Sequence, residues 1–190
     1  IGANIFYFSK KLPKASFIGV DYLNKRIQYA RKINKNNNVD FFVDDMNKKN
    51  KIVHKDIDLI TCVHTLCCFK KLNKPLKYMF KFNPKWIAIN SLFYEGFLDV
   101  LIHIRDHENL TNDNNVNSDF NIFSLPYLKK ELKKTNYRIY KYKKFFPNKN
   151  IKKPQNGKRG SYTIKTEFNR RTTFSGPVHL PWYFVLLKKI

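Results

Sequence analysis

The chain has 190 residues, 43% of them hydrophobic and 16% aromatic, so it can bury a full core as one domain and is not disordered by composition. No apolar run approaches the roughly 20 residues that a membrane-spanning helix needs. Lys and Arg outnumber Asp and Glu by 37 to 14, a formal net charge of +23, but the excess is mostly Lys spread along the whole chain and does not by itself predict a nucleic-acid partner.

In the first half, short apolar runs alternate with amphipathic stretches. Leu23, Ile27, Ala30 and Ile33 recur at helical spacing, directly after a buried-strand pattern. We expect helices over 2–12, 23–33 and 67–82, the last one broken near Pro75, and strands over 17–21, 39–43, 57–63 and 85–90. Strands that alternate with helices in this way predict βαβ units and a parallel sheet.

The second half changes character and becomes richer in strands. The pattern predicts a helix over 97–105, a polar loop over 109–121, a helix over 125–134, a strand over 137–146, a basic loop over 147–158, a hairpin of 161–165 with 172–174 around Asn169, and a last strand over 179–187. We interpret the chain as one domain, 1–190, in which 94–121 covers the substrate and 147–178 is an inserted basic loop and hairpin.

The most informative position is Asp21, which closes the strand over 17–21. An acid at the carboxyl end of a parallel strand can accept hydrogen bonds from both ribose hydroxyls of a nucleotide-like cofactor. A strand-ending Asp is also a common helix N-cap, so both roles are open for Asp21.

Two further groups have the residue types of a cofactor site. Gly2, followed by Ala3, opens a helix and would let the backbone approach a ligand closely, although an ordinary helix start has the same pattern. Asp45 follows the strand over 39–43 and could accept the amino group of an adenine while Met46 packs on the ring. Asp44 takes this role if the register is shifted by one residue, and a solvated turn is the alternative.

The strand over 57–63 ends at His64, which we expect near the reaction centre. Because the pKa of an unperturbed histidine lies near neutrality, His64 could act as a general base, or simply form a hydrogen bond at a strand end. The three cysteines, Cys62, Cys67 and Cys68, match neither a disulfide framework nor a zinc spacing, so we predict free thiols in a reducing cytoplasm and no metal site.

Taken in order, these features resemble the class I S-adenosylmethionine-dependent methyltransferases. The resemblance implies a Rossmann-like α/β three-layer sandwich with a mostly parallel sheet and an antiparallel C-terminal hairpin, and S-adenosylmethionine as cofactor. The cofactor-binding residues that it implies are Gly2, Ala3, Asp21, Tyr22, Asp44, Asp45, Met46, Thr61, Cys62 and Val63. The first strand and the first glycines of the family's loop are missing before Ile1, so we expect the natural protein to extend further upstream.

Residues after the fifth strand of the family pattern are the candidates for substrate recognition. Tyr94, Glu95, His103, Arg105, Asp106 and His107 mix acids, bases and an aromatic ring. We take Tyr94, Glu95, Arg105 and His107, with Trp182, as substrate-binding, and His64 and His103 as candidate catalytic bases. The alternatives are an exposed helix surface for the segment after the strand and a core position for Trp182.

The predicted reaction is methyl transfer from S-adenosylmethionine to an O or N atom of a small-molecule or glycan-type substrate. An RNA methyltransferase, favoured by the basic charge, and a non-catalytic binding module of the same fold are the alternatives. A nicotinamide dehydrogenase is disfavoured, because Tyr78 is followed by Lys81 and not by a Lys four positions on.

Overall fold

The computed structural model describes residues 2–48, 56–105, 107, 117–155 and 160–190. The chain divides into two units, Ile1–Lys55 and Asp56–Ile190, which we call the first and second unit. In the described part, no helix is long and apolar enough to cross a membrane.

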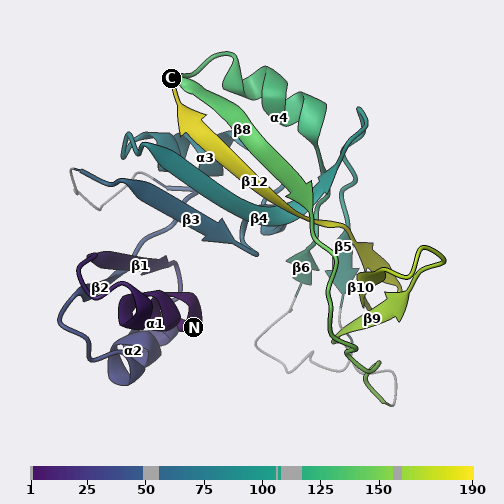
Figure 1. Ribbon diagram of the computed structural model, residues 1–190, viewed down its shortest axis with the longest axis horizontal. Helices are drawn as coiled ribbons and strands as arrows, with labels where there is room; N and C mark the ends of the chain where they lie inside the picture. Colours follow the sequence, from purple (N-terminus) through teal and green to yellow (C-terminus); the bar gives the residue numbers. More distant parts are fainter. Residues whose placement is uncertain (1, 49–55, 106, 108–116, 156–159) are drawn as a thin grey trace. The chain divides into compact units, whose positions relative to one another are not determined.

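The first unit alternates helices and strands: α1 (Ala3–Lys11), β1 (Phe17–Asp21), α2 (Asn24–Ile33) and β2 (Val39–Val43). The two strands pair in parallel, so that Asp21 lies beside Val43 at their carboxyl ends. Helix α2 lies beside the pair β1–β2 (Figure 1), and its Ile27 and Ala30 are buried against Phe41 of β2, as the helical spacing in the sequence predicts.

The second unit is built on one sheet in the strand order β3-β4-β12-β8, with β7 also paired to β4. Its strands are β3 (Leu59–Val63), β4 (Trp86–Tyr94), β7 (Phe123–Ser124), β8 (Tyr137–Lys144) and β12 (Trp182–Lys189). The pairs β3–β4 and β4–β7 are parallel, while β12 runs antiparallel to both β4 and β8. The predicted antiparallel pair at the end of the chain is therefore confirmed.

Helices α3 (Asn73–Phe80) and α4 (Leu125–Leu132) pack on this sheet (Figure 1). Leu125, Leu128 and Leu132 of α4 recur at i, i+3 and i+7 and are buried, as an amphipathic helix over a sheet requires. Phe80 of α3 stacks on Tyr137 of β8 with ring centroids 4.7 Å apart. The core lies between these helices and the sheet.

Two smaller sheets complete the second unit. Strands β9 (Ser161–Lys165), β10 (Arg171–Ser175) and β11 (Val178–Leu180) form an antiparallel sheet, and β5 (His103–Arg105) pairs with β6 (Asn117–Asp119). Asn169 has a positive φ of 58° in the turn between β9 and β10, so the predicted hairpin around it is confirmed. Positions 109–116 of the predicted polar loop and 156–158 of the predicted basic loop lie outside the described residues.

The predicted helix over 97–105 is wrong. Val100, Ile102 and Ile104 are β-branched and alternate with other residues, a period-two pattern that suits an extended chain better than a helix. Val100 forms an antiparallel bridge with Ile122, and the Ile102 backbone N–H donates to the Asn121 side chain. The segment is therefore extended and ends in β5.

Two other predicted elements are each divided into two shorter ones. The helix expected over 67–82 is a short 3-10 turn, η1 (Leu66–Cys68), followed by α3, and Pro75 lies in the first turn of α3, where a missing N–H leaves no helical hydrogen bond unmade. The last strand, expected over 179–187, is divided into β11 and β12 at Pro181, which has no N–H for a ladder.

Candidate functional site

Three carboxylates gather at the carboxyl ends of β1 and β2 in the first unit, and we call Asp21, Asp44 and Asp45 the acidic edge. Asp21 Oδ1 accepts the Leu23 N–H at 2.9 Å, just before α2 begins. Asp21 Oδ2 lies 3.5 Å from Arg26 Nη1, a long and partly exposed contact that holds this oxygen only weakly. One oxygen therefore steadies the helix start, while the other can accept a ligand hydrogen bond.

Asp44 and Asp45 differ in burial although they are adjacent. Asp44 is buried, its Oδ1 accepts the Asp45 N–H at 2.9 Å, and its own N–H donates to the Asp21 carbonyl at 3.1 Å. Asp45 is half-buried, and its Oδ1 accepts the Asn47 N–H at 2.9 Å. The geometry favours Asp45 over Asp44 as the residue that meets a ligand, with the half-buried Met46 next to it.

Gly2 has a left-handed conformation with φ of 65°, which favours glycine. A Cβ built on Gly2 would lie 3.2 Å from Ala30 Cβ and 3.2 Å from Asn34 Nδ2, so Gly2 packs against the C-terminal half of α2. Asp21 contacts the opposite end of α2. The structure thus brings Asp21, Asp44 and Asp45 together without Gly2, and the roles of Gly2, Ala3 and the exposed Tyr22 in cofactor binding stay predictions.

In the second unit, the chain turns sharply where β3 ends. His64 has a positive φ of 53°, and its N–H donates to the Asn90 carbonyl of β4 at 2.9 Å. The imidazole stacks on the buried Trp182 ring with centroids 4.2 Å apart. Burial lowers the pKa of His64 below its ordinary 6.5, and the Asn90 side chain partly offsets this. We call His64, Asn90 and Trp182 the aromatic corner; it holds a neutral imidazole at neutral pH.

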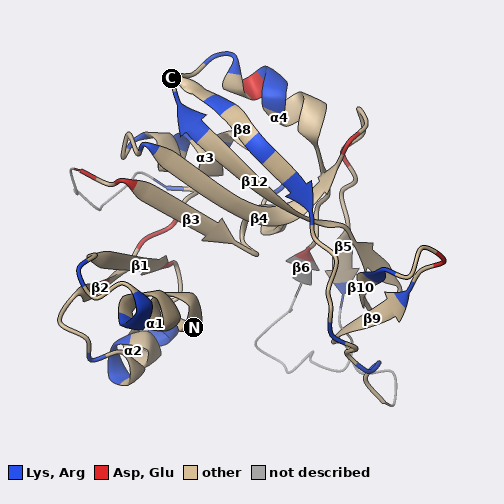
Figure 2. Ribbon diagram, viewed as in Figure 1, with Lys and Arg blue, Asp and Glu red and all other residues tan. Residues whose placement is uncertain are grey.

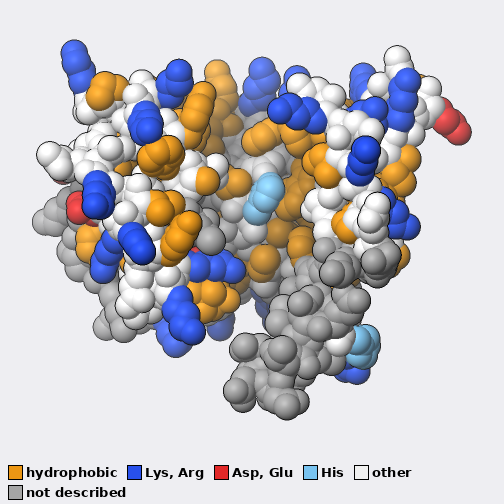
Figure 3. Space-filling view, turned by 90° about the horizontal axis from the view of Figure 1, so that it is seen from below, with side chains coloured by type: hydrophobic (Ala, Val, Ile, Leu, Met, Phe, Trp, Pro, Cys, Tyr) orange, Lys and Arg blue, Asp and Glu red, His pale blue; other side chains and the backbone are white. Residues whose placement is uncertain are grey.

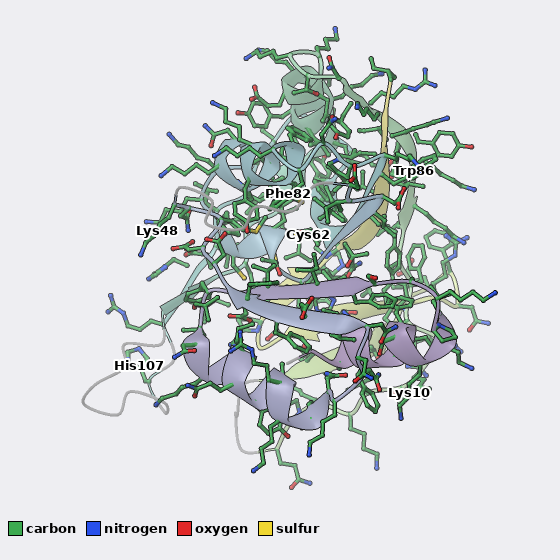
Figure 4. The ribbon with its side chains drawn as sticks, turned by 90° about the vertical axis from the view of Figure 1, so that its left-hand side faces the viewer. Lys10, Lys48, Cys62, Phe82, Trp86 and His107 are labelled. Atoms are coloured by element: carbon green, nitrogen blue, oxygen red, sulfur yellow. The ribbon has the colours of Figure 1, made fainter. Side chains whose placement is uncertain are left out.

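The other residues predicted at this strand end lie on β3. Cys62 is buried in the second unit (Figure 4), and burial raises the pKa of its thiol to about 12, so it stays protonated and is not a nucleophile. Thr61 and Val63 are exposed on the same strand. Their contact with the methionine part of the cofactor stays a prediction.

The segment 94–121, which we call the cover segment, is anchored at both ends in the described structure. Near its start, Asp99 Oδ1 accepts the Ser124 N–H at 2.7 Å, and Ser124 Oγ donates to the Gly96 carbonyl at 2.7 Å. At its end, the buried Asn121 donates from Nδ2 to the Phe69 carbonyl at 2.8 Å, just after the turn that follows His64. These bonds fix the ends of the cover segment beside β4 and η1.

The predicted substrate residues are spread along the cover segment. Tyr94 is half-exposed, and Glu95 accepts a hydrogen bond from the Tyr183 hydroxyl at 2.9 Å. His103 Nδ1 lies 2.9 Å from Asp119 Oδ1 on the β5–β6 pair, and Arg105 is exposed at the end of β5. His107 is exposed and lies on the periphery (Figure 4), whereas Asp106 lies outside the described residues. Of the two candidate bases, His64 stacks on an aromatic ring, and among the described residues no ring contact is found for His103.

Sequence reasoning missed Asn90 as a site residue. Asn90 is only 5% exposed, and its Nδ2 donates to the Tyr183 carbonyl at 3.1 Å, which locks β4 to β12 beside His64. The signal was present as a polar Asn90-Ser91 step inside an otherwise apolar strand, a pattern that favours a functional or hydrogen-bonded position.

Replacing Ser124 with alanine is expected to destabilise the second unit by about 1–2 kcal/mol, because Ser124 Oγ both accepts the Tyr127 N–H at the start of α4 and donates to Gly96. Urea unfolding of the purified variant measures the change. The exposed Ser161→Ala is the control and should stay within about 0.5 kcal/mol of wild type. Equal stability of the two variants would contradict the anchoring role of Ser124.

Comparison with known families identifies the fold. A family model described as a methyltransferase domain matches residues 2–143, which is most of the chain. The chain belongs to this methyltransferase family. The predicted membership of the S-adenosylmethionine-dependent methyltransferases is thereby confirmed, as is the assignment as a methyltransferase. Among curated proteins, no sequence matches this chain significantly.

Solved structures agree with the family at the level of the fold. An S-adenosylmethionine-dependent methyltransferase from Methanosarcina mazei is similar with a TM-score of 0.59 at 11% identity, over 95% of this chain and 85% of that one. One from Clostridium acetobutylicum has a TM-score of 0.57 at 14% identity, over 96% and 78% of the two chains. The Burkholderia thailandensis 1,6-didemethyltoxoflavin-N1-methyltransferase, solved with its substrate and S-adenosylhomocysteine, has a TM-score of 0.57 at 11% identity, over 99% and 66%. The predicted α/β Rossmann-like fold is confirmed.

Proposed function

We propose that this methyltransferase transfers the methyl group of S-adenosylmethionine to an O or N atom of a small-molecule or glycan-type acceptor. The cofactor supplies a methyl group already activated by a sulfonium, so the protein has to bind the cofactor and the acceptor, orient them toward each other and exclude water. The observation that carries the proposal is the aromatic corner, where a neutral His64 is stacked on a buried Trp182 beside the polar Asn90.

The acidic edge fits the adenosyl part of the cofactor. A ribose presents two hydroxyl donors, and Asp21 has one oxygen held only by a long contact to Arg26. The half-buried Asp45 and Met46 have the chemistry to accept an adenine amino group and to cover its ring. We assign Asp21 to the ribose and Asp45 with Met46 to the adenine.

The acceptor side of the proposal rests on the second unit. His64 is the candidate base for an acceptor hydroxyl, and the cover segment, with Tyr94, Glu95 and Trp182, is the candidate for acceptor binding. We further propose that 147–178 is an insertion, and that the protein works in a reducing cytoplasm, since Cys62, Cys67 and Cys68 form no disulfide in the described structure.

The RNA alternative is favoured by the net charge of +23. Lys and Arg are, however, spread over α1, α2, α4, β8 and β12 (Figure 2), and on the face drawn in Figure 3 they lie scattered among hydrophobic and polar side chains. An RNA-binding face would need basic residues grouped around the site. The spread supports a small-molecule acceptor.

The test is a screen of the full-length protein with S-adenosylmethionine and panels of small-molecule, glycan and RNA acceptors. The release of S-adenosylhomocysteine measures turnover on each acceptor. We expect turnover on a small molecule or glycan, insensitive to salt. RNA turnover, with RNA binding that falls steeply between about 50 and 200 mM salt, would replace the proposal with the RNA alternative.

A further inference from the structure

Glu95 has no basic partner among the residues that the structure describes, although the chain is strongly basic. It follows β4 directly, and its Oε1 accepts the Tyr183 hydroxyl at 2.9 Å. Within the described ranges, no Lys or Arg nitrogen lies within 4.0 Å of its carboxylate, although the chain has 37 Lys and Arg against 14 Asp and Glu. A carboxylate left unpaired among so many cations is available for a cation from outside.

The hydrogen bond to Tyr183 fixes the direction of this carboxylate. Tyr183 is only 4% exposed and belongs to β12 in the middle of the sheet, so its hydroxyl is held by the fold. Burial raises the pKa of Tyr183, and the neighbouring Glu95 raises it further, so the hydroxyl stays protonated and keeps donating. Glu95 is therefore a positioned anion and not a freely moving surface side chain.

The surroundings of the pair are aromatic. The half-exposed Tyr142 has its ring centroid 6.4 Å from that of Tyr183. Lys144 is opposite Tyr183 in the strand register, but its Nζ lies over the Phe146 ring at 5.5 Å and does not neutralise Glu95. A carboxylate beside tyrosine rings has the chemistry that proteins use to recognise organic ammonium groups.

The chain directly after Glu95 is apolar and exposed. Phe97 is 89% exposed, Leu98 66% and Leu101 65%, in the same cover segment that Asp99 and Ser124 anchor. Large apolar side chains clustered at this level of exposure mark a surface on which an apolar group binds. A ligand that suits Glu95 together with Phe97, Leu98 and Leu101 carries both a positive charge and an apolar group.

We propose that Glu95, held by Tyr183, whose ring lies 6.4 Å from that of Tyr142, binds a protonated amine of an acceptor that also carries an aromatic or aliphatic group. This inference rests on the proposed function and narrows its substrate class from small molecules in general to apolar amines. Glu95 then determines acceptor specificity, while the acidic edge, which serves the methyl donor, is a separate part of the protein.

The test compares two probes of nearly equal shape, 2-phenylethylamine and 2-phenylethanol, one cationic and one neutral at pH 7. Their binding to the full-length protein is measured by calorimetry, with and without S-adenosylhomocysteine. We expect the amine to bind at least about tenfold more tightly than the alcohol, the scale of one charge-assisted hydrogen bond.

Variants test whether the preference for the amine over the alcohol depends on Glu95. Glu95→Gln retains the shape and an acceptor for Tyr183 and should abolish the preference for the amine, and Tyr183→Phe should reduce it in part. Glu167→Gln, which removes the charge of another exposed glutamate, should leave the preference unchanged. Equal binding of the two probes, no binding of either, or a preference that survives in Glu95→Gln would overturn the inference.

The proposed function is judged by a separate measurement. Binding of S-adenosylhomocysteine to the wild-type protein, with no preference for the amine probe, overturns only the assignment of Glu95. Failure of S-adenosylhomocysteine to bind counts against the proposed function. The preference for the amine is then still measured in the titrations that contain no S-adenosylhomocysteine.

Discussion

Asp21→Ala is expected to weaken the binding of S-adenosylhomocysteine by about 1–3 kcal/mol, or roughly 5- to 150-fold, the scale of a lost hydrogen bond to a charged group. The reason is that Asp21 ends β1 beside β2 and keeps one carboxylate oxygen only weakly held. Calorimetry on the full-length variant measures the affinity. Because Asp21 also accepts the Leu23 N–H, urea unfolding of the same variant shows how much of the effect comes from stability.

Asp40→Ala is the matched control. Asp40 is an exposed acid on β2, three residues before Val43. Its replacement by alanine removes the same charge from the same two-stranded sheet. Its S-adenosylhomocysteine affinity should remain within about twofold of wild type, the range expected of a surface substitution. Equal losses in the two variants would mean that net charge, and not the position of Asp21, determines the affinity.

Much of the fold follows from local patterns. The helical spacing from Leu23 to Ile33 predicts α2 within one residue, and the apolar runs predict β1 and β2 at their observed bounds. The positions where such a sheet must place a cofactor-binding acid are the ends of its parallel strands. The positions of Asp21 and Asp45 at these strand ends could therefore be predicted from the sequence alone, and their contact with the cofactor stays a prediction.

What could not be predicted depends on partners distant in sequence. The extended course of the chain after Gly96 is set by Ile122 and Asn121, about twenty residues later, and a local pattern does not contain that pairing. The Glu95–Tyr183 bond joins residues 88 positions apart, across the antiparallel return of β12. The sequence predicts Glu95 as an acceptor-binding residue but contains no local signal for Tyr183 as its hydrogen-bond donor.

The same limit explains the choice between the two histidines. His64 and His103 are the same residue type, and both lie at the end of a strand: His64 follows β3, and His103 begins β5. Only the fold shows that His64 stacks on Trp182, 118 positions away, while His103 is paired with Asp119 on an exposed two-stranded sheet. Both histidines are exposed, so the stacking on Trp182 is the observation for which we propose His64, and not His103, as the base.

His64→Ala is expected to lower kcat by roughly 10²- to 10⁴-fold, the usual contribution of a general base, when the acceptor identified by the screen carries a hydroxyl or an ammonium that must lose a proton. His103→Ala serves as the control and should change kcat by less than about threefold, as for an exposed residue away from the reacting atoms. S-adenosylhomocysteine affinity should be unchanged in both variants. A larger loss in His103→Ala than in His64→Ala would reverse the assignment.

The pH dependence of kcat distinguishes a base from a packing residue. Because burial lowers the pKa of His64 below 6.5, its neutral form persists at neutral pH, and the rate should fall only as pH decreases below 6.5 through the lowered pKa. The contribution of His64 to the free energy of unfolding depends on pH in the same direction. It is fully present above pH 6.5 and is lost as the pH falls below 6.5 through the lowered pKa, because the unfolded chain takes up the proton first. Burial also lowers the pKa of His179, so stability alone would not single out His64. The acid limb of kcat should therefore disappear in His64→Ala and persist in His103→Ala; an acid limb retained in both variants would assign the proton transfer to another group.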